Sequence, residues 1–211
     1  MDPTRPVRNI TDGRRRRGAQ SRAIILSRAI EISSTEGLGG LTIGRLASDV
    51  GISKGNITGL FGDKEALQLA TLNAAVEVFR TKVIAPSTDE MEPVKRLQAL
   101  CDNWYDYVRQ RVFPGGCILY GTLSEYRAKP GTIQDQVNHH RNAWTKLLSL
   151  TVKQAQQRSQ IRLEIDADQM IFELTSFQAA ANIAFILGDQ LTFLRAHRTS
   201  RERIADSIFG R

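Results

Sequence analysis

Apolar residues recur every three or four positions along most of the chain, and no stretch shows the strict alternation of a β-strand. Clusters of glycine and proline separate these amphipathic stretches, as is typical of turns between helices. The pattern predicts helices over residues 14–36, 43–50, 54–60, 63–85, 94–112, 117–127, 131–160, 167–187 and 190–209. The expected fold class is therefore all-α.

Two of the predicted helices are short and adjacent, within residues 41–61 (LTIGRLASDVGISKGNITGLF). Thr42 can cap the first helix, Gly51 suits the left-handed conformation that ends it, and Ser53 can cap the second. The second helix presents one polar face, made by Lys54, Asn56 and Thr58. A helix of this length is unstable alone, so packing must hold it in place. This is the pattern of a helix-turn-helix, whose second helix, the recognition helix, enters the major groove of DNA.

A wider stretch, residues 14–79, resembles the DNA-binding part of the tetracycline-repressor (TetR) family of bacterial regulators. The motif SKGNITGLFGDKEAL at residues 53–67 carries the resemblance, together with Gly51. The chain departs from the family at Thr58, where an aromatic residue is common, and at Gly59, where histidine is frequent. The resemblance implies an N-terminal three-helix DNA-binding domain and a larger C-terminal helical domain that binds a ligand and dimerises.

These patterns divide the chain into a tail at residues 1–13, a helix-turn-helix domain at residues 14–62 and a C-terminal domain at residues 63–211. The tail contains prolines and has no apolar period, so we expect it to be flexible. The helix predicted over residues 63–85 connects the two domains. A rigid connection of this kind would let a distant event tilt the recognition helix.

Positive charge is concentrated in the DNA-binding part of the chain. The net charge is +7, and residues 1–62 contain ten Lys and Arg against five Asp and Glu. Four consecutive arginines begin the first helix, where the helix dipole favours acidic residues, so the run favours a contact with DNA over an idle solvated surface. Lys64 matches a position that commonly meets a phosphate in the TetR family. The residues expected to bind DNA are Arg14, Arg15, Arg16, Arg17, Thr42, Ser53, Lys54, Asn56, Thr58 and Lys64.

The sequence gives no signal of an enzyme, a cofactor site or a metal site. It lacks a phosphate-binding loop and a nucleophile elbow. His139 and His140 are adjacent, so on a helix they point about 100° apart and cannot readily share a metal. Cys101 and Cys117 are expected to be reduced thiols. No apolar run approaches the ~20 residues of a membrane span, and the N-terminus lacks the apolar stretch of a signal peptide, so we expect a cytoplasmic protein.

Aromatic residues gather in the C-terminal region, where the family resemblance implies a ligand cavity. Trp and Tyr combine apolar bulk with a polar group, which suits such a cavity, although a packed core would give the same pattern. The residues expected to bind the ligand are Trp104, Tyr107, Tyr120 and Trp144. Because no charge clusters among them, they indicate an apolar or aromatic effector rather than a phosphorylated metabolite.

The function that fits these features is a ligand-responsive transcriptional regulator, a repressor that binds double-stranded DNA at an inverted-repeat operator as a homodimer. The helices over residues 137–160 and 167–187 have the apolar surplus to form a four-helix dimer interface, which Ala180→Glu or Ala181→Glu would disrupt. Two alternatives stay open at this point. One is a nonspecific, architectural DNA-binding protein, and the other is a helical small-molecule carrier or enzyme with a vestigial helix-turn-helix.

Overall fold

The computed structural model describes the backbone of residues 10–208 and the side chains of residues 18–208. Within this range every regular element is helical, which confirms the all-α prediction. The helices are α1 (Ile10–Glu36), α2 (Ile43–Val50), α3 (Lys54–Phe61), α4 (Lys64–Phe79), α5 (Pro93–Arg109), α6 (Ile118–Tyr126), α7 (Thr132–Gln157), α8 (Ala167–Ile186) and α9 (Gln190–Ala205). A π-helical turn, η1 (Arg80–Ile84), and a 3₁₀ turn, η2 (Ala85–Ser87), extend α4.

The first helix begins earlier than its sequence pattern indicates. Backbone at residues 10–13, which we assigned to the tail, already belongs to α1, while residues 1–9 lie outside the described part of the chain. No proline occurs between Pro6 and Pro86, so nothing in this stretch forbids a helix. Gly13 costs a helix about 1 kcal/mol relative to alanine, which weakens the first turns without ending the helix.

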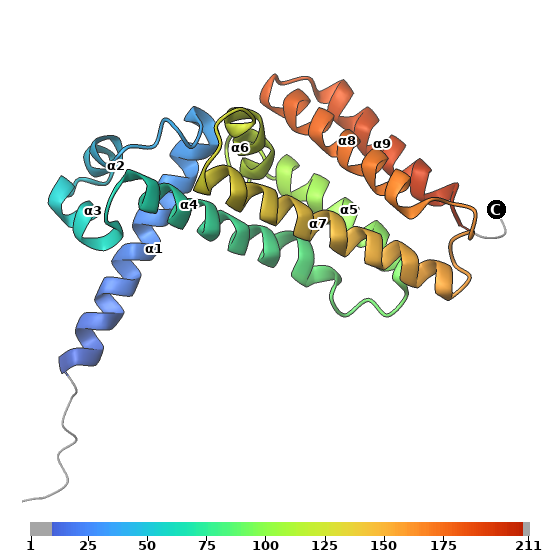
Figure 1. Ribbon diagram of the computed structural model, residues 1–211, viewed down its shortest axis with the longest axis horizontal. Coiled ribbons are helices and arrows are strands. Elements are labelled where there is room, and N and C mark those ends of the chain that lie inside the picture. The colour runs from blue at the N-terminus through green and yellow to red at the C-terminus, as the bar shows by residue number, and fades with distance from the viewer. Residues whose placement is uncertain (1–9, 209–211) are drawn as a thin grey trace, which may run out of the picture.

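The helices form two packed groups that meet along α4 (Figure 1). Helices α2 and α3 lie at one end beside α1, and α5 to α9 make up the larger group, with α8 and α9 as a pair along one side. Each group has its own hydrophobic core. The side chain of Leu67, near the start of α4, is buried in the smaller core, whereas Leu72, Ala75 and Phe79 are buried in the larger one. Helix α4 is thus shared by the two cores.

The smaller group also docks on α6 and on the start of α7. Ile133 of α7 is buried in the smaller core, and Tyr126 of α6 packs against it. Polar contacts accompany this packing: the backbone N–H of Gly39 donates to Glu125 Oε1 at 2.8 Å, and that of Gly115 donates to Ser34 Oγ at 3.2 Å. The position of the helix-turn-helix relative to the larger group therefore depends on the end of α6 and the loop before it.

Gly115 provides a test of this docking because its backbone lies directly against the end of α1. A Cβ at this position would lie 1.7 Å from the carbonyl oxygen of Ser34, and that oxygen belongs to the backbone and cannot rotate away. We expect Gly115→Ala to lower the free energy of unfolding by about 1–3 kcal/mol, as overpacked sites do. Urea denaturation measures the change.

Gly121→Ala is the matched control, because Gly121 lies inside α6 and a Cβ there would meet nothing within 4 Å. This substitution should stabilise the protein by up to about 1 kcal/mol through helix propensity. Equal effects of the two substitutions would mean that the contact between Gly115 and α1 does not constrain the domains.

Candidate nucleic-acid interface and ligand pocket

The turn between α2 and α3 is built by the three residues that the sequence marks for it. Thr42 accepts a hydrogen bond from the backbone N–H of Arg45 at 3.1 Å, and Ser53 accepts one from that of Asn56 at 3.2 Å. Gly51 ends α2 with φ 67° and ψ 30°, a left-handed conformation that glycine adopts without strain. These caps fix the start of α3 because they satisfy backbone donors that a short helix leaves free.

The recognition helix, α3, buries one side and exposes the other. Ile57 and Phe61 are buried in the smaller core, while Lys54, Asn56 and Thr58 are exposed. The hydroxyl of Thr58 donates to the carbonyl oxygen of Lys54 at 3.0 Å, so its proton is already used within the helix. The amide of Asn56 and the ammonium of Lys54 are therefore the groups on this face that can donate to base edges.

Arg22 of α1 holds the other end of α3, a role that the sequence did not indicate. Its guanidinium donates to the carbonyl oxygen of Leu60 at 2.7 Å and lies 4.3 Å from the centre of the Phe61 ring. A cation at a helix C-terminus satisfies a free carbonyl and complements the helix dipole. Arg22 thus orients the recognition helix from within the protein.

Two further arginines of the domain are engaged in an ion network around Asp49. Arg28 of α1 and Arg45 of α2 both pair with the Asp49 carboxylate, and Arg45 also pairs with Glu36 at 3.0 Å. A hydrogen bond from Arg28 has the largest effect on the pKa of Asp49, and one from Arg45 adds to it; together they lower this pKa to about 2. Arg45 and Asp49 are four residues apart on one helix, a spacing from which this part of the network could have been predicted. These two guanidinium groups stabilise the junction of α1 and α2.

Of the remaining predicted DNA contacts, the structure describes the side chain of Lys64. Lys64, at the start of α4, is exposed, and its ammonium donates to the carbonyl oxygen of Gly39 at 3.0 Å. A phosphate contact by Lys64 would compete with this bond. The side chains of the arginine run at residues 14–17 lie outside the described residues, so their predicted role stays a prediction.

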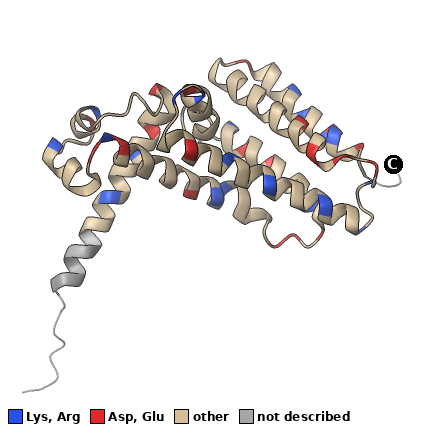
Figure 2. Ribbon diagram, viewed as in Figure 1, with Lys and Arg blue, Asp and Glu red and all other residues tan. Residues whose placement is uncertain are grey.

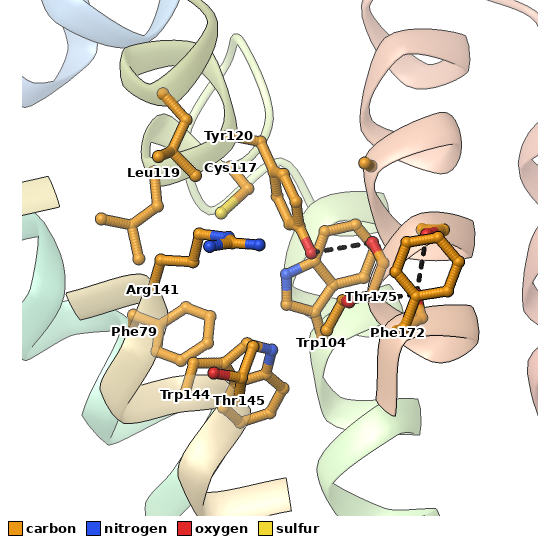
Figure 3. A pocket seen from close by; sticks show the side chains of 13 residues that line it. Phe79, Trp104, Cys117, Leu119, Tyr120, Arg141, Trp144, Thr145, Phe172 and Thr175 are labelled. Atoms are coloured by element: carbon orange, nitrogen blue, oxygen red, sulfur yellow. Dashed lines mark hydrogen bonds between the residues drawn. The ribbon is translucent and has the colours of Figure 1, made fainter. Parts of the chain in front are cut away.

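The larger group encloses a pocket of about 200 Å³ between α4, α5, α6, α7 and α8 (Figure 3). Three of the four predicted ligand residues line it. Its walls are formed by Phe79, Trp104, Cys117, Leu119, Tyr120, Leu123, Arg141, Trp144, Thr145, Phe172, Thr175, Ser176 and Ala179. Tyr107 is the exception: its ring lies behind the wall, packed edge-on against Phe79 at 5.8 Å and Phe113 at 5.7 Å.

The polar groups of the pocket aromatics are bound within the protein. The Tyr120 hydroxyl lies 3.1 Å from the carbonyl oxygen of Thr175 and 3.2 Å from Gln178 Oε1, to either of which it can donate. The indole N–H of Trp144 donates to the same Gln178 oxygen at 3.2 Å. Burial raises the pKa of Tyr120 well above 10, which keeps its hydroxyl protonated. These rings therefore offer the pocket mainly apolar surface.

Arg141 of α7 lines the pocket but is not among the ligand residues expected from the sequence, which are all aromatic. In Figure 3 its guanidinium points into the pocket, between Tyr120 and Cys117 on one side and Phe79 and Trp144 on the other. Burial raises the pKa of the Cys117 thiol, so this sulfur is a neutral wall group. The pocket thus combines apolar walls with a cation.

Neither a metal site nor a membrane span emerges from the described residues. No group of three or more His, Cys, Asp or Glu side chains among residues 18–208 is placed to hold a metal ion. No helix in the described range is long and apolar enough to cross a membrane.

Two domain families match the chain, one in its N-terminal part and one in its C-terminal part. Residues 25–71 match the family described as "Bacterial regulatory proteins, tetR family", and residues 93–200 match the one described as "Tetracyclin repressor-like, C-terminal domain". The chain belongs to the TetR family. It is therefore a TetR-family transcriptional regulator, and the resemblance carried by residues 53–67 is confirmed.

Solved structures of the TetR family share the fold. A TetR transcriptional regulator from Chloroflexus aurantiacus J-10-FL has a TM-score of 0.84 at 23% identity, covering 92% of this chain and 98% of that one. A transcriptional regulator from Saccharomonospora viridis in complex with choline has a TM-score of 0.77 at 20% identity, with coverages of 92% and 100%. AibR in complex with isovaleryl coenzyme A and operator DNA has a TM-score of 0.64 at 20% identity, with coverages of 76% and 85%. No curated protein sequence matches the chain.

The Asp49 network of this TetR-family protein should make its stability depend on pH in acid. The folded state holds the Asp49 pKa at about 2, below its ordinary 3.8, so folding favours the ionised carboxylate. The network's contribution is present above about pH 4 and is lost as the pH falls toward 2. Melting temperatures of wild type and Asp49→Asn should differ at pH 6 and converge near pH 2, whereas a pH-independent difference would contradict this role.

Proposed function

We propose that this protein is a homodimeric transcriptional repressor of the cytoplasm that binds an inverted-repeat operator and leaves it when a small molecule fills the pocket. The observation that carries the proposal is that the pocket and the DNA-reading unit share two helices. Phe79 of α4 and Tyr120 of α6 line the pocket. Leu67 of α4 and Tyr126 of α6 pack into the helix-turn-helix core. A shift of either helix moves both sites.

The energy needed for such a response is modest. A ligand releases DNA only if it binds the DNA-incompetent arrangement more tightly than the competent one. A hundredfold loss of operator affinity requires about 2.7 kcal/mol of coupling, within the usual range of allosteric proteins. The capture of a related fold, AibR, with both a small molecule and operator DNA supports a ligand-responsive role for this chain.

An exposed apolar face on α8 and α9 supports the homodimer. Ile183, Ile186 and Leu187 of this region are 56–76% exposed, and Leu191 and Leu194 of α9 are 67% and 54% exposed. Charged residues lie in the first half of α8, and residues 175–186 contain none (Figure 2). Large apolar side chains exposed together on two neighbouring helices are typical of an interface with another protein surface. A two-fold pairing of α8 and α9 with their copies would cover it.

This surface differs from the interface that we predicted from the sequence. The apolar stripe of α7, including Val137, Leu148 and Val152, is buried within the protomer, so α9 rather than α7 joins α8 in the proposed interface. Ala181 is also fully buried, and a charge there would disturb folding rather than assembly. The reason is that periodicity reveals an apolar stripe but not whether the stripe packs inside the chain or against a second copy.

Selection of binding sites from random duplex DNA separates this function from its two alternatives. A repressor dimer should select a defined inverted repeat with half-sites about one helical turn apart. An architectural protein would bind without a preferred motif, and a carrier with a vestigial helix-turn-helix would show no salt-dependent affinity for DNA.

Asn56 should determine one base pair in each half-site of the selected motif. Its exposed amide can pair with the N6 and N7 edge of adenine, a contact that discriminates by about 1–3 kcal/mol. We expect Asn56→Ala to relax preference at one position per half-site, measured by competition binding with duplexes mutated singly at each position. Asn142→Ala, an exposed position on α7, is the control and should leave every preference unchanged. An unaltered motif with Asn56→Ala would refute the assignment.

The proposed interface predicts that Ile183→Glu produces a monomer. Ile183 is 60% exposed in the middle of the apolar face, where a pair of carboxylates related by the two-fold axis would be desolvated. Light scattering at micromolar concentration should find a wild-type dimer and a folded monomeric variant with weak operator affinity. Leu163→Glu is the matched control, because Leu163 is 79% exposed but lies outside α8 and α9. A monomeric wild type, or a dimeric Ile183→Glu, would exclude this interface.

A further inference from the structure

The pocket has an unbalanced charge. Arg141 brings a permanent positive charge to its wall, and none of the thirteen wall residues is an Asp or a Glu. Within residues 18–208, Arg141 forms no ion pair, in contrast to Arg80, Arg109, Arg162, Arg198, Arg201 and Arg203. A guanidinium has five N–H donors and cannot lose its charge at neutral pH. Binding a neutral molecule here would desolvate this charge without compensating it.

The hydroxyl groups in the pocket cannot replace Arg141 as donors. Each Thr and Ser hydroxyl of the wall has one proton, and the structure uses it for a carbonyl of the same helix. These bonds run from Thr145 to Asn142 at 3.1 Å, from Thr175 to Ile171 at 2.8 Å and from Ser176 to Phe172 at 2.7 Å. The hydroxyls can only accept, and the Trp144 N–H is engaged by Gln178. Among the described wall residues, Arg141 is thus the charged donor for a ligand oxygen, beside the indole N–H of Trp104, whose ring also lines the pocket.

Arg141 also stands where the pocket opens. The residue is exposed overall, and with Thr145, Phe172 and Thr175 it borders a second, wider cavity of about 450 Å³ between α7 and α8. Lys146 and Lys153 line this outer cavity, and Asp168 lies 3.9 Å from the Lys153 ammonium. An anion that approaches from solvent therefore meets mainly positive charge before it reaches Arg141.

We propose that the effector of this pocket is an organic carboxylate, whose aromatic or branched apolar body lies against Trp104, Trp144 and Phe79 while its carboxylate pairs with Arg141. The planar fork of a guanidinium matches both oxygens of a carboxylate and gives a charge-assisted pair. This assignment rests on the proposed function in that it treats the pocket as the effector site. It adds a carboxylate to the apolar or aromatic effector expected from the sequence.

A series of ligands with one apolar body and different end groups tests the assignment. The series is 3-phenylpropionate, the neutral 3-phenylpropanol, the cationic 3-phenylpropyl-trimethylammonium and the coenzyme A thioester of 3-phenylpropionate. The only two tryptophans of the chain both line the pocket, so intrinsic fluorescence reports binding without DNA. We expect the carboxylate to bind at least tenfold more tightly than the alcohol, and the cation not to bind.

Substitutions at Arg141 assign the effect to this side chain. Arg141→Met should weaken binding of the carboxylate about tenfold or more and leave binding of the alcohol unchanged or stronger. Arg141→Lys keeps the charge but loses the fork, and should recover part of the affinity. Arg109→Met, an exposed arginine at the end of α5, is the control and should behave as wild type. Circular dichroism and melting temperature check that each variant is folded.

The outcomes separate this inference from the proposed function. Equal affinity for carboxylate and alcohol, no fluorescence response to the carboxylate at millimolar concentration, or an Arg141→Met variant with wild-type affinity would overturn it. Tighter binding of the thioester than of the free acid would also overturn it, because the carboxylate is then masked and the anionic contacts lie elsewhere. Carboxylate binding that depends on Arg141 but does not release the selected operator would support the ligand class and refute the proposed induction.

Discussion

The structure depends on one constraint: α4 must pack into two hydrophobic cores at once. Leu67 fills the core of the helix-turn-helix, and Phe79, twelve residues later, fills the core of the larger group and forms part of the pocket wall. A helix transmits displacement along its axis because its backbone hydrogen bonds make it stiff, and these two residues lie about 18 Å apart along it. Neither core can rearrange around α4 without moving a residue of the other.

The second link, through α6, has few polar contacts, as the proposed response to a ligand requires. At the end of α6, Glu125 accepts the Gly39 N–H with one carboxylate oxygen, while its buried Oε2 has no hydrogen-bond partner among the described residues. A partly satisfied buried carboxylate stabilises an arrangement less than a fully satisfied one. The docking of the helix-turn-helix on α6 is therefore held by few polar bonds beside the packing of Tyr126 and Ile133, so a small movement of the pocket wall can bias it.

The parts of the fold that were predictable from the sequence are those that local chemistry determines. Thr42, Gly51 and Ser53 specify the turn because each acts on backbone groups within a few residues. Contacts between distant segments leave no such signal. The aromatic character of Tyr107 and the family resemblance predicted it as a pocket residue, and neither indicated Arg141. The packing of α5 and α7 against their neighbours instead directs Arg141 into the cavity and Tyr107 behind its wall. The ion network of Arg28 and Asp49 joins residues 21 positions apart and was missed for the same reason.

The composition of the recognition helix ties DNA reading to assembly. Gly59 lies on the exposed face of α3, where a Cβ would meet nothing within 4 Å, so neither packing nor a turn requires glycine there. Such a glycine costs the helix about 1 kcal/mol relative to alanine and leaves the face with few side chains that reach a base. With the proposed base contacts, Asn56 and Lys54 of one protomer would supply little discrimination. In the proposed dimer, two protomers in fixed register would double these contacts, so the apolar face of α8 and α9 would determine how well α3 reads a sequence.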